Sequence, residues 1–400
     1  MTIALSGFSV FGLHPFGRRN AVQASGEAPT SAPPSDAAVL SASGLSDLSA
    51  DQKQALSGLS PSDQAAFVTA WKAADGTGRD RLGQLLLTPL TRQVDSRGNT
   101  LLANLSALAG LTPPKDAPYK AQDILNETLK HLLDSETIHQ DNRNTCTVTT
   151  VQFMVLKEQP SEYARLVAGI AGKGEVKLRS GDTLTRVADS IPTDSSSRDD
   201  VERLMQSAFM NHGFDLRGHY SNVQDGFELS DWAKTADSIL NAPLKALHGL
   251  GGWFHQVPDS PIDLQKTAEG MNQGNTEGRV MNLYEQITGH RSTLVGDLPG
   301  GVFAAPASLR GDTAERFLAA ARAGKTVPVE ISTKDLHDDP NDYQEHVLPP
   351  GSVSITDILH QILVTGVQGD RVTYRNPWGY ETSMSIAEFK SRVLDGIIPD

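Results

Sequence analysis

Residues 358–379 of this 400-residue chain have the sequence ILHQILVTGVQGDRVTYRNPWG. The first half is an apolar run, Gln368-Gly369-Asp370 has the composition of a turn, and Val372-Thr373-Tyr374 is rich in β-forming residues. The pattern predicts two antiparallel strands joined by a tight turn. Such a hairpin brings Asn376, at the end of the returning strand, beside His360, near the start of the first.

Another strand precedes this hairpin, and helical patterns precede both. Val327 to Ile331 follows Gly324 with β-branched residues, and Pro328 favours an edge position because proline cannot donate to the ladder. Helical spacing of apolar residues is found further upstream at about 119–133, 161–171, 281–287 and 314–323. Helices followed by a strand-rich end favour the α+β class over a doubly wound sheet.

The composition of the amino-terminal part predicts a disordered leader. Residues 21–43 are mostly Ala, Ser, Pro and Gly, without an aromatic residue. Such a segment cannot bury enough apolar area to offset the entropy lost on ordering, so about residues 1–45 are predicted to be disordered. Arg18 and Arg19 follow the first apolar stretch, which is the reverse of the order in a secretory signal peptide.

A small helical region is predicted over residues 46–114. Ser49 with Gln52 makes a capping box, and Ser60-Pro61 is a helix start. The region ends at Thr112-Pro113-Pro114, and nothing in it indicates catalysis. The rest of the chain, 115–400, is predicted to be the catalytic domain.

Composition excludes several classes of function. The 35 basic and 48 acidic residues give a formal charge of −13, which disfavours binding to nucleic acid. No run of 18 apolar residues is present, so no transmembrane segment is expected. One cysteine excludes an intramolecular disulfide framework and any multi-cysteine metal site. Zinc-protease and nucleophile-elbow motifs are missing as well, and we expect neither a cofactor nor a metal.

That single cysteine, Cys146, lies where a reactive thiol would lie. The polar turn 139–145 precedes it and an apolar stripe begins at Val148, so Cys146 is predicted at a helix N-terminus. This position lowers the pKa of a thiol, and the thiolate is the nucleophile. A lone cysteine is by default a small buried hydrophobic residue. The catalytic interpretation needs a base from elsewhere in the chain, and His360, at the mouth of a strand, is the candidate.

The candidate partners of His360 follow in the hairpin. The amide oxygen of Asn376 can accept the imidazole N–H and hold the ring in the productive tautomer. Trp378, two residues later, can cover that hydrogen bond from water. The spacing therefore predicts a Cys–His–Asn arrangement with a supporting tryptophan.

These blocks resemble a known family. His360 with Gly366 six residues later, and Asn376-Pro377-Trp378-Gly379 at a separation of 16 residues, are similar to the histidine and asparagine blocks of papain-like cysteine peptidases. The tetrapeptide is closest to the calpain branch. Gln140, six residues before Cys146, occupies the place of the family's oxyanion glutamine. The resemblance implies a papain-like fold, in which a helical half carries the cysteine and an antiparallel β half carries the histidine and asparagine.

Two departures from the family pattern concern the surroundings of the nucleophile. Thr147 stands where the family usually has an aromatic residue, and Asn144-Thr145 replaces the Gly-x approach to the cysteine. The separation of 214 residues from Cys146 to His360 exceeds that in small papain-like enzymes. This excess implies an insertion at about 173–276.

The resemblance implies a cysteine peptidase that cleaves protein or peptide substrates. Cys146 would attack the carbonyl, His360 would move the proton, and Asn376 would orient His360. Gln140 and the backbone N–H of Cys146 would stabilise the oxyanion. The same residues would also serve a glutamine deamidase or an acyltransferase, and a third hypothesis is a catalytically inactive interaction module.

Localisation is less constrained. A polar leader on an acidic hydrolase resembles effector proteins exported by dedicated bacterial secretion systems, which predicts secretion by a non-classical route. A cytoplasmic enzyme with a flexible tail is the alternative. Neither the oligomeric state nor the substrate is indicated by the sequence.

Overall fold

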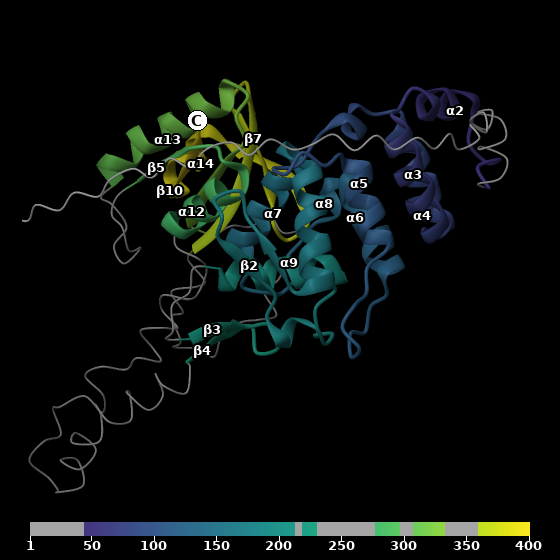
Figure 1. Ribbon diagram of the computed structural model, residues 1–400. Helices are drawn as coiled ribbons and strands as arrows, with labels where there is room; N and C mark the ends of the chain where they lie inside the picture. Colours follow the sequence, from purple (N-terminus) through teal and green to yellow (C-terminus); the bar gives the residue numbers. More distant parts are fainter. Residues whose placement is uncertain (1–43, 213–217, 230–276, 297–306, 333–358) are drawn as a thin grey trace, which may run out of the picture.

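The computed structural model describes residues 44–212, 218–229, 277–296, 307–332 and 359–400. Helices and an antiparallel sheet both occur, so the predicted α+β class is confirmed (Figure 1). The predicted leader lies outside the described residues up to residue 43. Its last residue, Leu45, is buried in the core, so the folded part of the chain includes residue 45. Of the predicted insertion, residues 213–217 and 230–276 also lie outside the described residues.

Helices dominate the first half of the chain. The capping box of Ser49 and Gln52 starts the first of them, and Ser60 caps the next by accepting from the Asp63 N–H, so both predicted helix starts are confirmed. The α-helices are α2 (Ala50–Ser57), α3 (Pro61–Ala73), α4 (Gly76–Leu86), α5 (Leu101–Ala109), α6 (Ala121–Leu133), α7 (Cys146–Glu158), α8 (Pro160–Ala168) and α9 (Asp200–Asn211). Shorter helical turns are η1 (Pro89–Arg92), η2 (Ser135–Thr137), η3 (Gly169–Lys173, a π-helix) and η4 (Ala188–Ser190).

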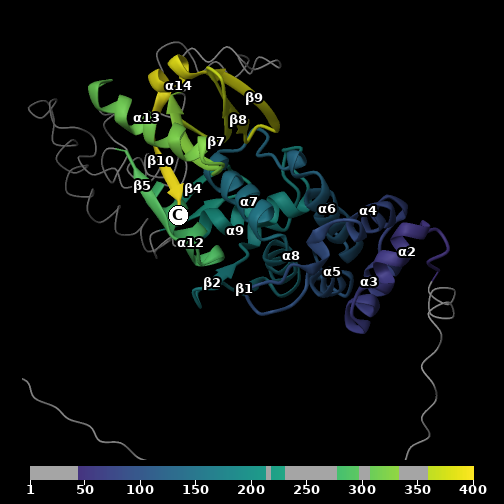
Figure 2. The ribbon, with the colours of Figure 1, turned by 90° about the horizontal axis from the view of Figure 1, so that it is seen from above.

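One hydrophobic core joins the helices on both sides of residue 114. It extends from Leu45 through Leu105 of α5 and Leu129 of α6 to Met205 of α9. Helix α5 packs against both α3 and α8, and Figure 2 shows α2–α5 beside α6 and α8. The predicted helical region 46–114 is therefore not packed as a separate unit, because its apolar faces are buried against the helices that follow it.

The second half forms a six-stranded antiparallel sheet in the order β5-β10-β6-β7-β8-β9. Its strands are β5 (Ser292–Val295), β6 (Val327–Ser332), β7 (Leu359–Gln368), β8 (Arg371–Asn376), β9 (Tyr380–Ser385) and β10 (Val393–Pro399). Strands β7 and β8 form the hairpin that the sequence predicts. Two-stranded ribbons lie outside this sheet. They are formed by β1 (Glu175–Lys177) with β2 (Thr183–Thr185) and by β3 (Gly218–Ser221) with β4 (Gly226–Leu229).

The prediction of an edge position for β6 is wrong. The final strand, β10, inserts between β5 and β6, so that β6 pairs with β7 on one side and with β10 on the other. Pro328 is tolerated because the register between β6 and β10 ends at Val329, which pairs with Gly396. The missing N–H of the proline thus falls beyond the last pair of that ladder.

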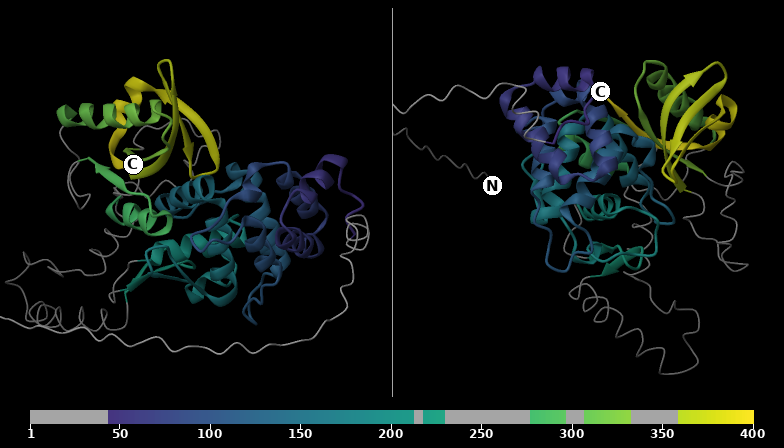
Figure 3. Two further views of the ribbon diagram at one scale, coloured as in Figure 1. Left: turned by 45° about the horizontal axis from the view of Figure 1, so that its top comes forward. Right: turned by 90° about the vertical axis from the view of Figure 1, so that its right-hand side faces the viewer.

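Alternate residues of β7 face two different cores. Ile362 and Val364 pack with Phe317 of α13 (Ala307–Arg322), the helix that lies along this sheet with α14 (Ile386–Arg392) (Figure 3). Leu363, between them, packs with Phe153 of α7 and Tyr284 of α12 (Glu277–Thr288). This second contact joins the helical half to the sheet half. None of the described helices combines the length and apolar character that crossing a membrane requires.

Candidate active site

His360 and Asn376 are brought together by the hairpin. Strands β7 and β8 pair antiparallel, with Leu363 opposite Arg375, so the start of one strand lies beside the end of the other. The Nε2 of His360 lies 2.9 Å from Oδ1 of Asn376. Both side chains are buried, with His360 5% and Asn376 0% exposed. The predicted pairing of these two residues is present in the structure.

Trp378 covers this hydrogen bond. Its ring stacks on the imidazole of His360 with 4.4 Å between ring centroids and 22° between planes. The Trp378 backbone N–H also donates to Oδ1 of Asn376 at 3.1 Å. Gly379 then turns the chain with φ 108°, a value that favours glycine. The Asn-Pro-Trp-Gly stretch therefore places a ring, a backbone donor and a turn around one histidine.

The protonation of His360 is set by its burial. Desolvation lowers its pKa to about 4, although the hydrogen bond to Asn376 acts in the opposite direction. The imidazole is therefore neutral at pH 7. A neutral imidazole can accept a proton, which is what a general base must do.

Cys146 is the first residue of α7, as the sequence predicts. Its thiol is free of disulfide bonding and the residue is partly exposed. The residue before it, Thr145, is buried, and Oγ1 of Thr150 donates to the carbonyl of Cys146 at 2.9 Å. The backbone N–H groups at this end of a helix stabilise negative charge nearby.

Gln140 is docked on the Asn-Pro-Trp-Gly turn through its backbone. Its N–H donates to the carbonyl of Pro377 at 2.7 Å. The Nε2 of its buried side chain donates to the carbonyl of Arg143 at 2.5 Å, and Oε1 has no hydrogen-bond partner among the described residues. An amide nitrogen carries two hydrogens, so one is used inside the turn and the second can be donated to another acceptor.

Further contacts hold the turn before Cys146 against the end of β8. Arg375 donates to the backbone carbonyls of Glu136 at 2.7 Å and Ile138 at 2.6 Å. A Cβ added at Gly379 would lie 3.1 Å from Cβ of His139, so the two backbones approach closely there. The strand that ends at Asn376 and the turn that leads to Cys146 are thus directly connected.

Gln206 of α9 joins two residues of the turn before Cys146 to helix α7. Its Oε1 accepts from Oγ1 of Thr145 at 2.8 Å, and its Nε2 donates to the carbonyl of His139 at 2.9 Å and to Oε1 of Gln152 at 3.2 Å. Gln206 is fully buried. One amide therefore connects the residue before Gln140, the residue before Cys146 and the second turn of α7.

Arg198 supports Gln206 from the other side. Its guanidinium donates to Oε1 of Gln206 at 3.0 Å, to Oδ1 of Asn222 at 2.7 Å and to Oδ2 of Asp194 at 2.7 Å. Burial by itself raises the pKa of Asp194. Hydrogen bonds from Ser196 and the charge of Arg198 outweigh that effect and lower the pKa to about 2. Asp194 is therefore ionised, and the pair is a buried salt bridge.

Asp225 holds the last part of the turn. Its carboxylate accepts from the backbone N–H of Asn144 at 2.9 Å, from Nδ2 of the same residue at 3.0 Å and from the hydroxyl of Tyr220 at 2.7 Å. Its backbone has φ 52°, in the left-handed region that Asp and Asn tolerate best after glycine. Burial raises the pKa of Asp225.

Sequence reasoning missed Gln206, Arg198 and Asp225, which belong to the segment predicted to be an insertion. Each lies some tens of residues from the turn it holds, and no local pattern in the sequence marks it. The described part of that segment is therefore a support for the turn before Cys146. Tyr380, which the sequence analysis also did not single out, accepts from Nδ2 of Asn376 at 2.9 Å.

His131, Asp199 and Glu202 could in principle hold a metal ion, since their ligand atoms lie within 4.8 Å of one another. Each already has a protein partner. Asp199 and Glu202 form the capping box of α9, and Asp199 also accepts from Nε2 of His131 at 2.9 Å. Glu202 accepts from the backbone N–H of His139 at 2.7 Å. The capping box accounts for the proximity of Asp199 and Glu202. Through the bond from Glu202 to His139, the cluster supports the turn that contains Gln140.

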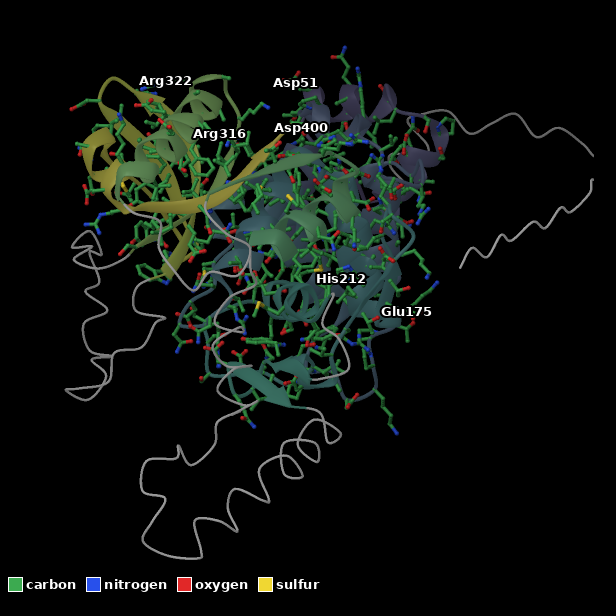
Figure 4. All side chains as sticks on the ribbon, turned by 90° about the vertical axis from the view of Figure 1, so that its left-hand side faces the viewer. Asp51, Glu175, His212, Arg316, Arg322 and Asp400 are labelled. Carbon is green, nitrogen blue, oxygen red and sulfur yellow. The ribbon has the colours of Figure 1, made fainter. Side chains whose placement is uncertain are left out.

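A polar hollow lies elsewhere on the described surface. It is lined by residues of β2 and its flanking turns together with Asn211, His212 and Gln286. His212, at the end of α9, is labelled in Figure 4. The side chain of Asn211 donates to the carbonyl of Ser207 at 2.9 Å, and Nε2 of His212 lies 2.5 Å from Oε1 of Gln286. None of Cys146, His360 and Asn376 lines it, so the hollow and the candidate active site are separate features.

Comparison with known proteins adds no family to this geometry. No family model matches the sequence, and a search of curated proteins finds no match either.

Proposed function

We propose that this protein is a cysteine hydrolase with a papain-like arrangement of Cys146, His360 and Asn376, and that it acts as a peptidase. The observation that carries the proposal is the buried hydrogen bond between His360 and Asn376, stacked under Trp378. A histidine kept neutral by burial, oriented by an amide and shielded from water is suited to general-base catalysis. A merely structural hairpin end would not need all three features.

The packing of α7 on β7 supports the approach of Cys146 to His360. Phe153 and Leu363 belong to one hydrophobic cluster where the two elements meet. Cys146 is seven residues before Phe153, a rise of about 10 Å along a helix. His360 is three residues before Leu363, which is about 10 Å along a strand.

The direction of the two elements is indicated by a second contact. Gln140 N–H donates to the Pro377 carbonyl, so the turn that leads into α7 lies beside the turn next to His360. The N-terminus of α7 and the start of β7 therefore point to the same part of the molecule. This geometry supports a reaction between the thiol and the imidazole.

The reaction follows from the residue chemistry. The Cys146 sulfur attacks the carbonyl carbon while His360 accepts the thiol proton, and the resulting oxyanion is stabilised at the N-terminus of α7 and by the Gln140 amide. His360 then gives its proton to the leaving amine, which departs and leaves a thioester. Water, deprotonated by His360, hydrolyses the thioester and restores the thiol. Asn376 holds the ring in place throughout.

Activity profiling with a thiol-directed electrophile tests the proposal. The wild-type chain is expected to be labelled and to hydrolyse substrate, and Cys146→Ala is expected to lose both while its Tm changes little, because the thiol is partly exposed. Thr69→Ala, at a solvent-exposed hydrogen bond on α3, is the control and should keep wild-type labelling. A Cys146→Ala variant that unfolds would show instead that the cysteine is a core residue.

The same assay separates the kinds of reaction. Fragments from casein support the peptidase, whereas ammonia released from a glutamine-rich protein without fragments identifies a deamidase. Label without either product, together with transfer of an acyl group to an added amine, identifies an acyltransferase. If no label enters the folded wild-type chain at any pH between 5 and 9, the site is inactive and the proposal is wrong.

A further inference from the structure

The amide of Asn376 is held at both of its ends. Oδ1 lies 2.9 Å from Nε2 of His360 and accepts from the backbone N–H of Trp378 at 3.1 Å. Nδ2 donates to the hydroxyl oxygen of Tyr380 at 2.9 Å. Asn376 and Tyr380 are cross-strand partners at the end of β8 and the start of β9. All polar atoms of a fully buried side chain thus have partners.

The chemistry of these partners decides which way the amide points. A backbone N–H can only donate, so the amide atom that faces Trp378 must be the oxygen. The opposite end is then the nitrogen, and the hydroxyl of Tyr380 must accept from it. A flipped amide would direct its N–H groups at the N–H of Trp378 and at His360, so the backbone donor of Trp378 decides the orientation, while the Tyr380 hydroxyl, which can donate or accept, fixes the far end of the amide.

The orientation of the amide in turn decides the tautomer of the histidine. An oxygen facing Nε2 requires that nitrogen to carry the proton. In the neutral ring Nδ1 then holds the lone pair, and it is the atom that can accept the proton of Cys146.

We propose that Tyr380 is a positioning residue, which holds the Asn376 amide in the orientation that keeps His360 protonated on Nε2 and basic on Nδ1. This inference rests on the proposed function, since it names the residue that prepares the base. Trp378 anchors the oxygen and Tyr380 anchors the nitrogen. Loss of either anchor leaves a buried polar atom without its partner and loosens the amide, so that it holds the proton of His360 on Nε2 less firmly.

The test uses Tyr380→Phe in the full chain, which removes one hydroxyl and keeps the ring. Tyr284→Phe is the matched control, because its hydroxyl makes a hydrogen bond of 2.7 Å to Glu158 on α7, away from His360. Two readouts are measured for each chain: the ¹⁵N chemical shifts of the His360 ring at pH 7, and the pH dependence of the rate of Cys146 alkylation by iodoacetamide.

We expect the wild-type ring to be protonated on Nε2, and we expect Tyr380→Phe to shift it toward the other tautomer. The alkylation rate should fall by about two- to tenfold, the effect of one hydrogen bond. Tyr284→Phe should leave both readouts unchanged. Unaltered ring shifts and rates in folded Tyr380→Phe would overturn the inference, as would a wild-type ring protonated on Nδ1, which can be measured even if the variant does not fold.

Failure of the proposed function is distinguishable from failure of this inference. If the wild-type chain is not alkylated and shows no turnover, the proposed function fails, whatever the tautomer. If the wild type reacts but Tyr380→Phe behaves like Tyr284→Phe, the proposed function stands and the role of Tyr380 is overturned.

Discussion

The two halves of the candidate site are organised over different distances along the chain. In the sheet half, His360 binds Asn376 16 residues later, and Trp378 follows Asn376 by two residues. In the helical half, the turn before Cys146 is held by Gln206, 61 residues from Thr145, and by Asp225, 81 residues from Asn144. One half is built from neighbours in sequence and the other from residues that only the fold brings together.

This difference has a consequence for how the site can fail. A hairpin whose partners are close in sequence loses little chain entropy on forming. The turn before Cys146 depends instead on buried polar groups, each of which is costly when it loses a partner. We therefore expect changes in the helical half to act mainly on stability and changes in the hairpin to act mainly on catalysis.

The largest expected effect is that of Arg198→Met. The substitution removes one partner of the buried pair with Asp194 and one bond to Gln206, so the free energy of unfolding should fall by about 3–5 kcal/mol. Urea denaturation measures it. Arg322→Ala, at the exposed pair with Glu315 and labelled in Figure 4, is the control and should leave the free energy of unfolding nearly unchanged. Equal losses in both variants would show that Arg198 does not support the turn.

The next effect is a pH dependence of stability that arises from His360. Its pKa of about 4 in the folded chain lies below the unfolded value of 6.5, so the unfolded chain binds a proton first as the pH falls. The contribution of neutral His360 to the free energy of unfolding is fully present above pH 6.5. It falls by about 3 kcal/mol as the pH is lowered from 6.5 to 4.

His360→Gln, which cannot titrate, isolates this contribution. The free energy of unfolding of both chains is measured in urea from pH 7.5 to 4. On acidification that of the wild type should fall relative to that of the variant. If the free energy of unfolding of the wild type rises relative to that of the variant on acidification, His360 is held as an imidazolium, paired with a thiolate.

Asn376→Ala should act on the rate more than on substrate affinity. It removes the acceptor that orients His360, and we expect kcat to fall by about ten- to a thousand-fold with KM nearly unchanged. Trp378→Ala should produce a milder loss in the same direction, since water can then compete for the bond. Steady-state kinetics on the folded fraction provides the measurement.

The control for Asn376→Ala is another buried asparagine. Asn104→Ala removes hydrogen bonds from α5 to Asp95, in the preceding loop, and to Ser161 of α8, so it should destabilise the fold without changing kcat of the folded enzyme. If Asn376→Ala behaves in the same way, the Asn-Pro-Trp-Gly stretch is only a turn that closes a hairpin.

The smallest expected effect is that of Asp225→Asn. Asparagine tolerates the left-handed backbone at this position but is a weaker acceptor for Asn144, so the cost should be about 1 kcal/mol. The alkylation rate of Cys146 should fall slightly in parallel. Asp312→Asn, an exposed change on α13, should alter neither quantity. A loss as large as that of Arg198→Met would mean that the carboxylate charge itself holds the turn.

Some predictions from sequence were confirmed because they depend on near neighbours. The capping box of Ser49 and Gln52, the start of α7 at Cys146 and the β7–β8 hairpin all follow from patterns within about 20 residues. The edge position of β6 was predicted from Pro328 alone, and it was wrong because β10, about 65 residues later, supplies the second neighbour. The boundary at residue 114 did not separate two cores, because composition marks a loop and does not report what packs across it.

The sequence by itself determined the secondary structure around the site and the spacing that pairs His360 with Asn376, because turns, caps and hairpins are decided by residues close along the chain. Only the tertiary structure decided what holds Cys146 in place and which way the Asn376 amide points. Gln206, Arg198, Asp225 and Tyr380 act through hydrogen bonds that form at about 3 Å whatever the separation in sequence. Such contacts depend on how the helices and the sheet pack, and no local pattern specifies them.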